Sequence, residues 1–338
     1  MSLSLSNKIE KLSFKAPDGC VLEGYRINNN SNNSLIFAKG LFSIGDYYKD
    51  FLQEIANKTQ NNIGTLNYRA HGNSGGIYNE EKCFQDFNQF VNQYLSENNV
   101  SLMGYSIGCN YIIKILYELF SKNFDLFTKI DKIVLISPHY SVELTDGTIQ
   151  KDLNWAKKGI DLVNWCNKTP LVNRLNINTK ALTKSANLFF NIKDSIEFVS
   201  PIHPRKVRPE VYSLSDFVYV KGGARVYDMD NIYKQFTGGI QIKKLFEEDE
   251  GHFFRDFLKD TKKVISLFGR KDRNIGFNKH YNLFNITTEL FSQIGEVKKY
   301  NLDHELSLEK YKKKNFKGKK KIIPHPFVLD DIVNFLLS

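Results

Sequence analysis

The chain has 338 residues and a formal charge of +10, from 47 basic and 37 acidic side chains. Hydrophobic residues make up 41% of the chain, a content that is ordinary for a globular protein and too high for a disordered one. No apolar run approaches the roughly 18 residues of a membrane-spanning helix, and the first residues lack the pattern of a signal peptide, so we expect neither.

The strands and helices expected from hydrophobic periodicity alternate along the first 138 residues. Strands are expected at residues 8–16, 20–27, 35–38, 63–68, 100–103 and 133–137, and helices at residues 44–57, 84–95 and 110–119. The first two strands form a hairpin around the turn Pro17-Asp18-Gly19. Alternating strands and helices are typical of βαβ units, so we expect an α/β protein with a mostly parallel sheet.

This alternation stops after residue 138 and returns near residue 262. The intervening stretch holds both tryptophans and several prolines without a clear period. A strand at 264–268, a helix at 279–294, a strand at 297–302 and a final helix at 327–337 follow. We therefore predict a core of residues 1–138 and 262–338, with residues 139–261 as a cap or lid inserted after the sixth strand.

The four cysteines, Cys20, Cys83, Cys109 and Cys166, are too few and too scattered for a disulfide framework or a zinc cluster. We interpret them as free thiols in a reducing cytoplasm. The sequence contains no phosphate-binding glycine loop and no dinucleotide fingerprint, and its histidines lack the spacing of metal ligands. We therefore expect no cofactor and no metal.

The segment Gly104-Tyr105-Ser106-Ile107-Gly108 carries the strongest indication of chemistry, because it joins a predicted buried strand directly to a predicted helix. A serine on such a sharp turn is held in strained backbone geometry, with its hydroxyl projecting from the carboxyl edge of the sheet. Glycines on either side allow the close approach of strand and helix. We interpret Ser106 as a nucleophile held on a turn of this kind.

With this motif, the sequence resembles the α/β-hydrolase superfamily over about residues 8–138 and 262–338. Ala38-Lys39-Gly40-Leu41 follows the third strand, where the family often has His-Gly and an oxyanion-hole amide. The loop at residues 67–76 is similar to the family's Arg-Gly-His-Gly-x-Ser loop, and residues 268–272 are similar to its Gly-x-x-Asp. The resemblance implies a mostly parallel sheet of about eight strands flanked by helices.

By this resemblance Ser106 is the nucleophile and Asp272 the acid, with Asp146 as a weaker substitute for the acid. The histidine has two candidates. His304 directly follows the last predicted strand and is favoured, because a base must lie within reach of the serine. His325 precedes the final helix and is the alternative.

Two other histidines receive no catalytic role. We interpret His71 as a structural loop residue, and His252 falls in the insertion.

The resemblance also implies an oxyanion hole formed by the backbone amides of Leu41 and Ile107. Lys39 departs from the family pattern, since histidine is common at its position. Two interpretations of Lys39 stay open: it places a positive charge near the site, or it points to solvent.

A second feature is a lysine loop at residues 310–321. Its members are Lys310, Lys312, Lys313, Lys314, Lys317, Lys319, Lys320 and Lys321. Such a run is typical of a solvated insertion, and its alternative role is weak contact with an anionic surface or an anionic thioester substrate. We expect no nucleic-acid partner, because a general bias toward Lys, Asn and Ile explains the positive charge.

These residues together predict a serine hydrolase that cleaves a small-molecule carboxylic ester or thioester through an acyl-enzyme. Two alternatives remain. One is an acyltransferase that uses the same acyl-enzyme, and the other is a catalytically silent binding protein with this fold.

Overall fold

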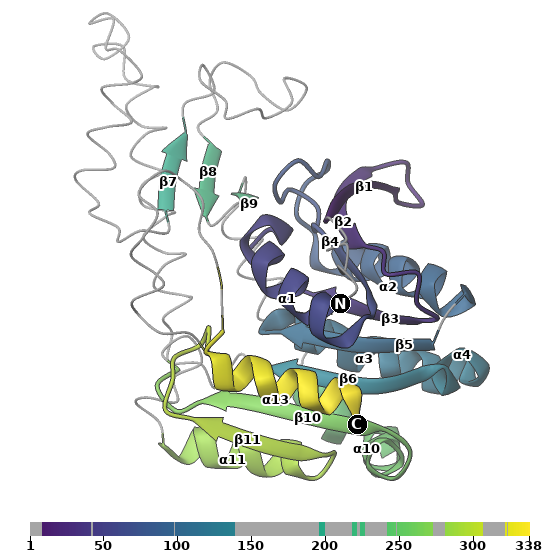
Figure 1. The fold of residues 1–338 in the computed structure, drawn as a ribbon, viewed down its shortest axis with the longest axis vertical. Helices are drawn as coiled ribbons and strands as arrows, with labels where there is room; N and C mark the ends of the chain where they lie inside the picture. Colours follow the sequence, from purple (N-terminus) through teal and green to yellow (C-terminus); the bar gives the residue numbers. More distant parts are fainter. Residues whose placement is uncertain are drawn as a thin grey trace, which may run out of the picture.

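The computed structural model describes residues 9–41, 43–97, 99–138, 196–199, 218–221, 224–226, 242–247, 249–272, 281–306, 322 and 324–338. An eight-stranded sheet with the order β1-β2-β4-β3-β5-β6-β10-β11 dominates it (Figure 1). Its strands are β1 (Glu10–Lys15), β2 (Val21–Ile27), β3 (Asn33–Ala38), β4 (Asn62–Leu66), β5 (Asn99–Tyr105), β6 (Ile130–Ile136), β10 (Lys263–Gly269) and β11 (Glu296–Tyr300).

Six neighbouring strands of this sheet, from β4 to β11 in its spatial order, are paired in parallel. At the other end of the sheet, β2 is antiparallel to both of its neighbours, β1 and β4. The neighbours β4, β3, β5, β6, β10 and β11 are joined by parallel ladders. The predicted mostly parallel sheet of about eight strands is therefore confirmed, and the carboxyl ends of its parallel strands meet at one edge.

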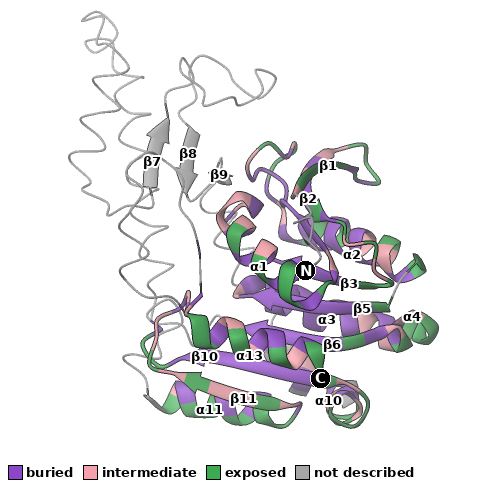
Figure 2. Ribbon diagram, viewed as in Figure 1, coloured by how far each residue is buried: buried purple, intermediate pink, exposed green. Residues whose placement is uncertain are grey.

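Helices cover both faces of the sheet. The helices α1 (Lys49–Thr59) and α13 (Pro326–Leu337) share one hydrophobic cluster with the sheet. The helices α2 (Glu80–Glu97), α3 (Ile107–Lys122) and α11 (Tyr281–Ser292) share the cluster on the other face. The central strands are buried from both sides (Figure 2). This double burial explains why they read as continuous apolar runs rather than as alternating ones.

The structure shifts the bounds of the expected elements and adds two short ones. Helix α2 begins at Glu80 and ends at Glu97, beyond the expected 84–95. Its polar ends lack the apolar periodicity on which the expected bounds were based. A 3₁₀ turn η1 (Gly45–Tyr48) precedes α1, within the range expected to be helical. Helix α4 (Phe124–Thr128) was not expected, and the side chain of Asn123 caps it by accepting from the Leu126 amide.

Parts of the predicted cap are described. The strands β7 (Ile196–Val199), β8 (Val218–Lys221) and β9 (Ala224–Val226) form an antiparallel sheet. Helices α9 (Ile242–Glu247) and α10 (Asp249–Thr261) follow, and Phe254 of α10 packs on Tyr117 of α3 with ring centroids 5.3 Å apart. The end of the predicted cap thus packs into the hydrophobic cluster of the core, while the domain division itself stays a prediction.

Three further predictions concern residues that fall outside the described ones: most of the cap, the substitute acid Asp146 and the lysine loop. Cys20, Cys83 and Cys109 are free thiols, and Cys166 also lies outside the described residues. In the ranges that the structure does describe, no helix is both long enough and apolar enough to cross a membrane.

Candidate active site

Ser106 occupies a strained turn between β5 and α3. Its backbone has φ 54° and ψ −122°, a combination that residues with a side chain rarely adopt. The Ser106 amide donates to the carbonyl of Ile136 at the end of β6. Ser106 is partly exposed, although the residues on both sides of it are buried. The sharp turn that the sequence predicts at this position is therefore present.

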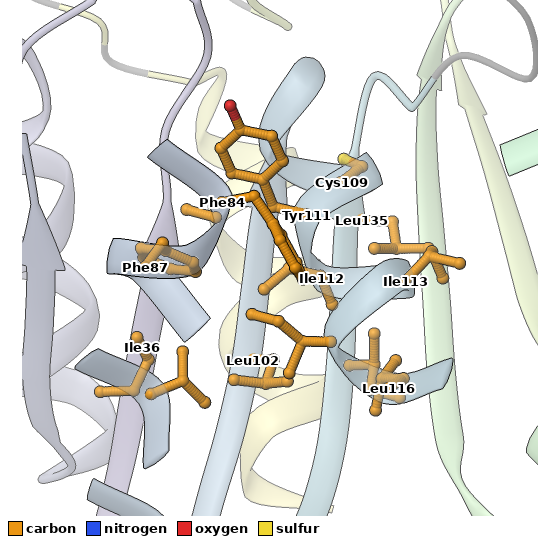
Figure 3. Close-up of a cluster of buried hydrophobic side chains, with 14 of the residues drawn as sticks. Ile36, Phe84, Phe87, Leu102, Cys109, Tyr111, Ile112, Ile113, Leu116 and Leu135 are labelled. Atoms are coloured by element: carbon orange, nitrogen blue, oxygen red, sulfur yellow. The ribbon is translucent and has the colours of Figure 1, made fainter. Parts of the chain in front are cut away.

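Deep burial of α3 holds this turn in place. Figure 3 shows Ile112, Ile113 and Leu116 of α3 packed toward side chains of the central strands and of α2. These α3 residues are completely buried. Burying a Leu or Ile side chain contributes about 1.5–3 kcal/mol, so this face of the helix resists displacement. The start of α3, and with it Ser106, is consequently fixed relative to the sheet.

The two glycines of the motif permit close contact of backbones. A Cβ atom added to Gly104 would lie 2.7 Å from the Cα of Cys109. One added to Gly108 would lie 2.1 Å from the carbonyl oxygen of Ala38. Both contacts are with backbone atoms, which cannot rotate away. The start of α3 therefore presses against the end of β3, which continues into Lys39-Gly40-Leu41.

We expect Gly108→Ala to lower the free energy of unfolding by about 3 kcal/mol, because the added methyl group collides with the Ala38 carbonyl. Urea unfolding followed by circular dichroism measures this change. Gly75→Ala serves as the control, because its added Cβ would meet nothing closer than 3.3 Å and its loss should be smaller. Equal stability of the two variants would contradict the expected collision.

Asp272 and His304 meet at the same edge of the sheet. The strands β10 and β11 are parallel neighbours, with Gly269 opposite Tyr300, so the loops that follow them lie side by side. The Lys271 amide donates to the carbonyl of Leu302, which ties the two loops together. The Nδ1 of His304 lies 2.5 Å from Oδ2 of Asp272, and both side chains are buried.

Opposing effects act on the protonation of His304. Burial disfavours the charged imidazolium, but the charge and the hydrogen bond of Asp272, with smaller effects of Glu305 and Asp303, outweigh it. The pKa of His304 is therefore raised above its ordinary value of 6.5. Because Nδ1 faces the carboxylate as a donor, Nε2 is the nitrogen that remains to accept a proton.

The imidazole of His304 lies beside the serine turn. Its ring packs on that of Tyr105, the residue before Ser106, with centroids 5.3 Å apart. Its backbone is held by Ser137 at the end of β6, whose hydroxyl donates to the His304 carbonyl over 2.7 Å. Sequence reasoning missed Ser137, although its place directly after a buried strand at the carboxyl edge could have pointed to it.

The alternative histidine, His325, has a different position. It is the N-cap of α13, and its Nδ1 accepts a hydrogen bond from the Phe327 amide. Its own amide donates to the carbonyl of Leu306. Of the two candidates, the structure pairs His304 with Asp272 and gives His325 the role of a helix cap.

Leu41, one predicted oxyanion-hole donor, follows Gly40 in the turn after β3. A Cβ on Gly40 would lie 2.9 Å from the Tyr105 ring and 3.6 Å from the Cβ of Ser106, so this turn lies directly against the serine. Ile107, the other predicted donor, is the first residue of α3. The turn and the helix start therefore bring both amides beside Ser106, where the dipole of α3 also favours negative charge.

Neither interpretation of Lys39 describes its environment. The side chain is 0% exposed, and its Nζ lies 3.8 Å from the centroid of the Tyr68 ring. No hydrogen-bond partner of this Nζ is present among the described residues. The amine therefore points into the core rather than to solvent. Burial also lowers the pKa of Lys39 well below its ordinary value, which disfavours the positive charge that the other interpretation requires.

The loop after β4 is structural, as the sequence indicates for His71. Its ring is buried, with Nδ1 2.8 Å from the carbonyl oxygen of Arg69. The Arg69 guanidinium binds both oxygens of Asp86 and both oxygens of Asp18. These charge-assisted bonds anchor the loop to α2 and to the β1–β2 turn. The other histidine without a catalytic role, His252, is exposed on α10.

Within the described residues, no group of three or more histidines, cysteines or carboxylates has an arrangement that could hold a metal ion.

Solved structures share this architecture. An α/β hydrolase from Novosphingobium aromaticivorans superposes with a TM-score of 0.52 at 13% identity, covering 98% of both chains. An esterase from Exiguobacterium antarcticum superposes with a TM-score of 0.52 at 14% identity, covering 97% of this chain and 100% of that one. The chain has the α/β-hydrolase fold. A thioesterase domain from the curacin biosynthetic pathway shares this fold over 98% of this chain and 100% of that one, with a TM-score of 0.50 and 12% identity.

Similarity in sequence is more limited. No protein-family model matches the chain. It is 29% identical over 174 residues to an uncharacterized protein of Acanthamoeba polyphaga mimivirus, covering 48% of this chain and 57% of that protein. It is 29% identical over 149 residues to ethanol acetyltransferase 1 of Wickerhamomyces anomalus, covering 42% of this chain and 37% of that protein. The matches thus span only 25% to 57% of the curated relatives' lengths.

Proposed function

We propose that this α/β-hydrolase-fold chain is a serine hydrolase that cleaves a carboxylic ester or thioester through an acyl-enzyme on Ser106. The single observation that carries the proposal is the buried Asp272–His304 pair, which packs on Tyr105 next to the strained Ser106. A serine hydroxyl is a weak nucleophile unless a base removes its proton, and this pair supplies such a base.

The proposed reaction begins with attack of the Ser106 Oγ on the substrate carbonyl carbon, while Nε2 of His304 takes the hydroxyl proton. Asp272 holds the imidazole through Nδ1 and stabilises the imidazolium. The amides of Leu41 and Ile107 donate to the developing oxyanion. His304 then gives its proton to the leaving alcohol or thiol. A water molecule, activated by the same histidine, hydrolyses the acyl-enzyme and regenerates Ser106.

Residues 139–261 have a place in this proposal. As an insertion after the sixth strand, they would shape the acyl pocket and shield the reaction from bulk water. The lysine loop at residues 310–321 would attract anionic substrates such as coenzyme A thioesters. Both statements depend on the sequence pattern, and a salt series on thioester cleavage tests the second. Rates that are independent of salt would contradict it.

A fluorophosphonate probe tests the proposed nucleophile. The probe reacts only with an activated serine, and mass spectrometry of the labelled protein identifies the modified residue. We expect the label on Ser106, and a panel of p-nitrophenyl esters together with acetyl coenzyme A to show turnover. A folded protein that resists the probe and all of these substrates would instead support the catalytically silent binding protein.

Acyl transfer is the second candidate, favoured by the partial similarity to ethanol acetyltransferases of Wickerhamomyces anomalus and Cyberlindnera fabianii. Hydrolysis and transfer share the acyl-enzyme and differ in whether water or an alcohol attacks it. Gas chromatography of reactions with p-nitrophenyl acetate or acetyl coenzyme A and added ethanol separates them. Ethyl acetate in excess over acetate at millimolar ethanol would identify a transferase, and acetate alone a hydrolase.

The proposed role of Asp272 has a consequence for the pH dependence. His304 must be neutral to accept the proton, so activity should fall as the pH drops through its raised pKa. Asp272→Asn removes the charge that raises this pKa, so the acid limb of kcat/KM should move to lower pH. The variant should also lose about 10⁴-fold in kcat. A pH–rate profile measures both effects, and an acid limb that stays in place would contradict this role.

A further inference from the structure

A buried hydroxyl fixes the turn that carries the Leu41 amide. The Oγ of Ser43 donates a hydrogen bond of 2.6 Å to the carbonyl oxygen of Gly40. The Ser43 amide approaches the same oxygen at 3.4 Å. Ser43 is only 7% exposed, so water does not compete freely for this bond. The Gly40 carbonyl is therefore held in one direction.

That direction also sets the Leu41 amide. The carbonyl of Gly40 and the N–H of Leu41 belong to the same planar peptide group, and the described residues contain no cis peptide bond. In a trans peptide the C=O and the N–H point in opposite directions. Fixing the Gly40 carbonyl toward Ser43 therefore aims the Leu41 N–H away from Ser43, on the opposite side of the turn.

The preceding peptide group is held in the same way. The hydroxyl of Tyr68, two residues after the end of the neighbouring strand β4, donates to the carbonyl oxygen of Lys39 over 2.7 Å. Tyr68 is buried, and the Lys39 amine lies over the face of its ring. Two consecutive carbonyls of the turn thus accept hydrogen bonds from buried hydroxyls, and neither peptide group is free to rotate.

Tyr48 connects Ser43 to the rest of the site. Its hydroxyl donates to the Ser43 Oγ at 3.3 Å, which leaves the Ser43 proton to the Gly40 carbonyl. The Tyr48 ring packs edge-on against Tyr105 with centroids 5.8 Å apart, and Tyr105 in turn packs on His304. A continuous set of contacts therefore joins the turn after β3, the residue before the serine and the histidine.

We infer that Ser43, supported by Tyr48, is a positioning residue that orients the Leu41 N–H toward the oxyanion of the reaction. The inference rests on the proposed function, because an oxyanion forms only if Ser106 attacks a carbonyl. An oxyanion hole is effective when its donors need no reorganisation as charge develops. Ser43 touches neither the substrate nor the reacting atoms and acts through the Gly40–Leu41 peptide group.

The test compares Ser43→Ala with the conservative Ser43→Thr. With the best ester substrate, Ser43→Ala should lower kcat about 10- to 100-fold and leave KM unchanged, which is less than the full loss of an oxyanion donor. Its affinity for a trifluoromethyl ketone, which forms a tetrahedral adduct with the serine, should fall by a similar factor. Ser43→Thr keeps the hydroxyl and should retain most of kcat.

Further measurements separate positioning from a loss of folding. Thermal unfolding identifies any variant that does not fold. Tyr48→Phe then keeps the packing on Tyr105 and removes only the hydroxyl, so it should lower kcat by a smaller factor than Ser43→Ala does. The acid limb of the pH profile should not move in any of these variants, because Asp272 and His304 are unchanged.

The outcomes distinguish the inference from the proposed function. A wild-type protein whose Ser106 does not react with a fluorophosphonate would overturn both. A reactive wild-type protein with a folded Ser43→Ala variant of unchanged kcat, or with only KM raised, would overturn the positioning role alone. A fall in kcat that Ser43→Thr does not rescue would also overturn it, because the hydroxyl would then not be the cause.

Discussion

Replacement of Ser106 by alanine is expected to lower kcat/KM by about 10⁵- to 10⁶-fold and to abolish labelling by a fluorophosphonate. The oxygen that would form the acyl-enzyme is lost, and a histidine–carboxylate pair cannot replace a missing nucleophile. The residual rate should reflect binding and the oxyanion hole alone. Initial rates on the preferred ester measure the loss, and intact-protein mass spectrometry measures the labelling.

The fold should tolerate this change. Alanine adopts the same backbone conformation as serine at φ 54°, so the strain of the turn is unchanged. We expect the free energy of unfolding to differ from wild type by less than about 0.5 kcal/mol. Ser121→Ala is the matched control, because Ser121 is an exposed residue near the end of α3 and its change should leave activity intact. Full activity of a folded Ser106→Ala variant would refute the proposed nucleophile.

The second large effect is expected for His304→Ala, with a loss of about 10⁶-fold in kcat. This change removes the proposed base and leaves the buried Asp272 carboxylate without the imidazole that it contacts at 2.5 Å. The loss should therefore appear in activity and in stability together, since removing a close partner of a buried carboxylate is destabilising. Steady-state kinetics and urea unfolding measure the two effects.

His325→Ala offers a matched histidine substitution. His325 caps α13, so its loss should lower the free energy of unfolding by about 1 kcal/mol and change kcat less than threefold. The contrast between the two variants decides which histidine is the base. A His325→Ala variant that is inactive while His304→Ala stays active would reverse the proposed assignment.

The order and type of the core elements followed from local sequence. Apolar runs such as residues 133–137 and the periodic helix at 110–119 carry their own signal, because burial on two faces or on one face imposes a characteristic spacing. The GxSxG segment between a strand and a helix can likewise be recognised from its own local sequence, without reference to other parts of the chain. The predicted sheet and the turn at Ser106 were therefore accessible from sequence.

The contacts between distant segments were not accessible in this way. His304 and His325 both suit the position of a base in the sequence, and the parallel pairing of β10 with β11 is what brings His304 to Asp272. Lys39 was expected either to place a positive charge near the active site or to point to solvent. Its burial on Tyr68 depends on β4 lying beside β3, which local composition does not report.

Sequence by itself thus determined the α/β architecture and the position of the serine turn, because both arise from local hydrophobic periodicity and backbone strain. Only the tertiary structure decided which histidine meets the acid, where the Lys39 amine lies, and which hydroxyls hold the Lys39 and Gly40 carbonyls. These are pairings between residues on different strands and loops. Their geometry depends on strand order and register, which no single segment of the chain specifies.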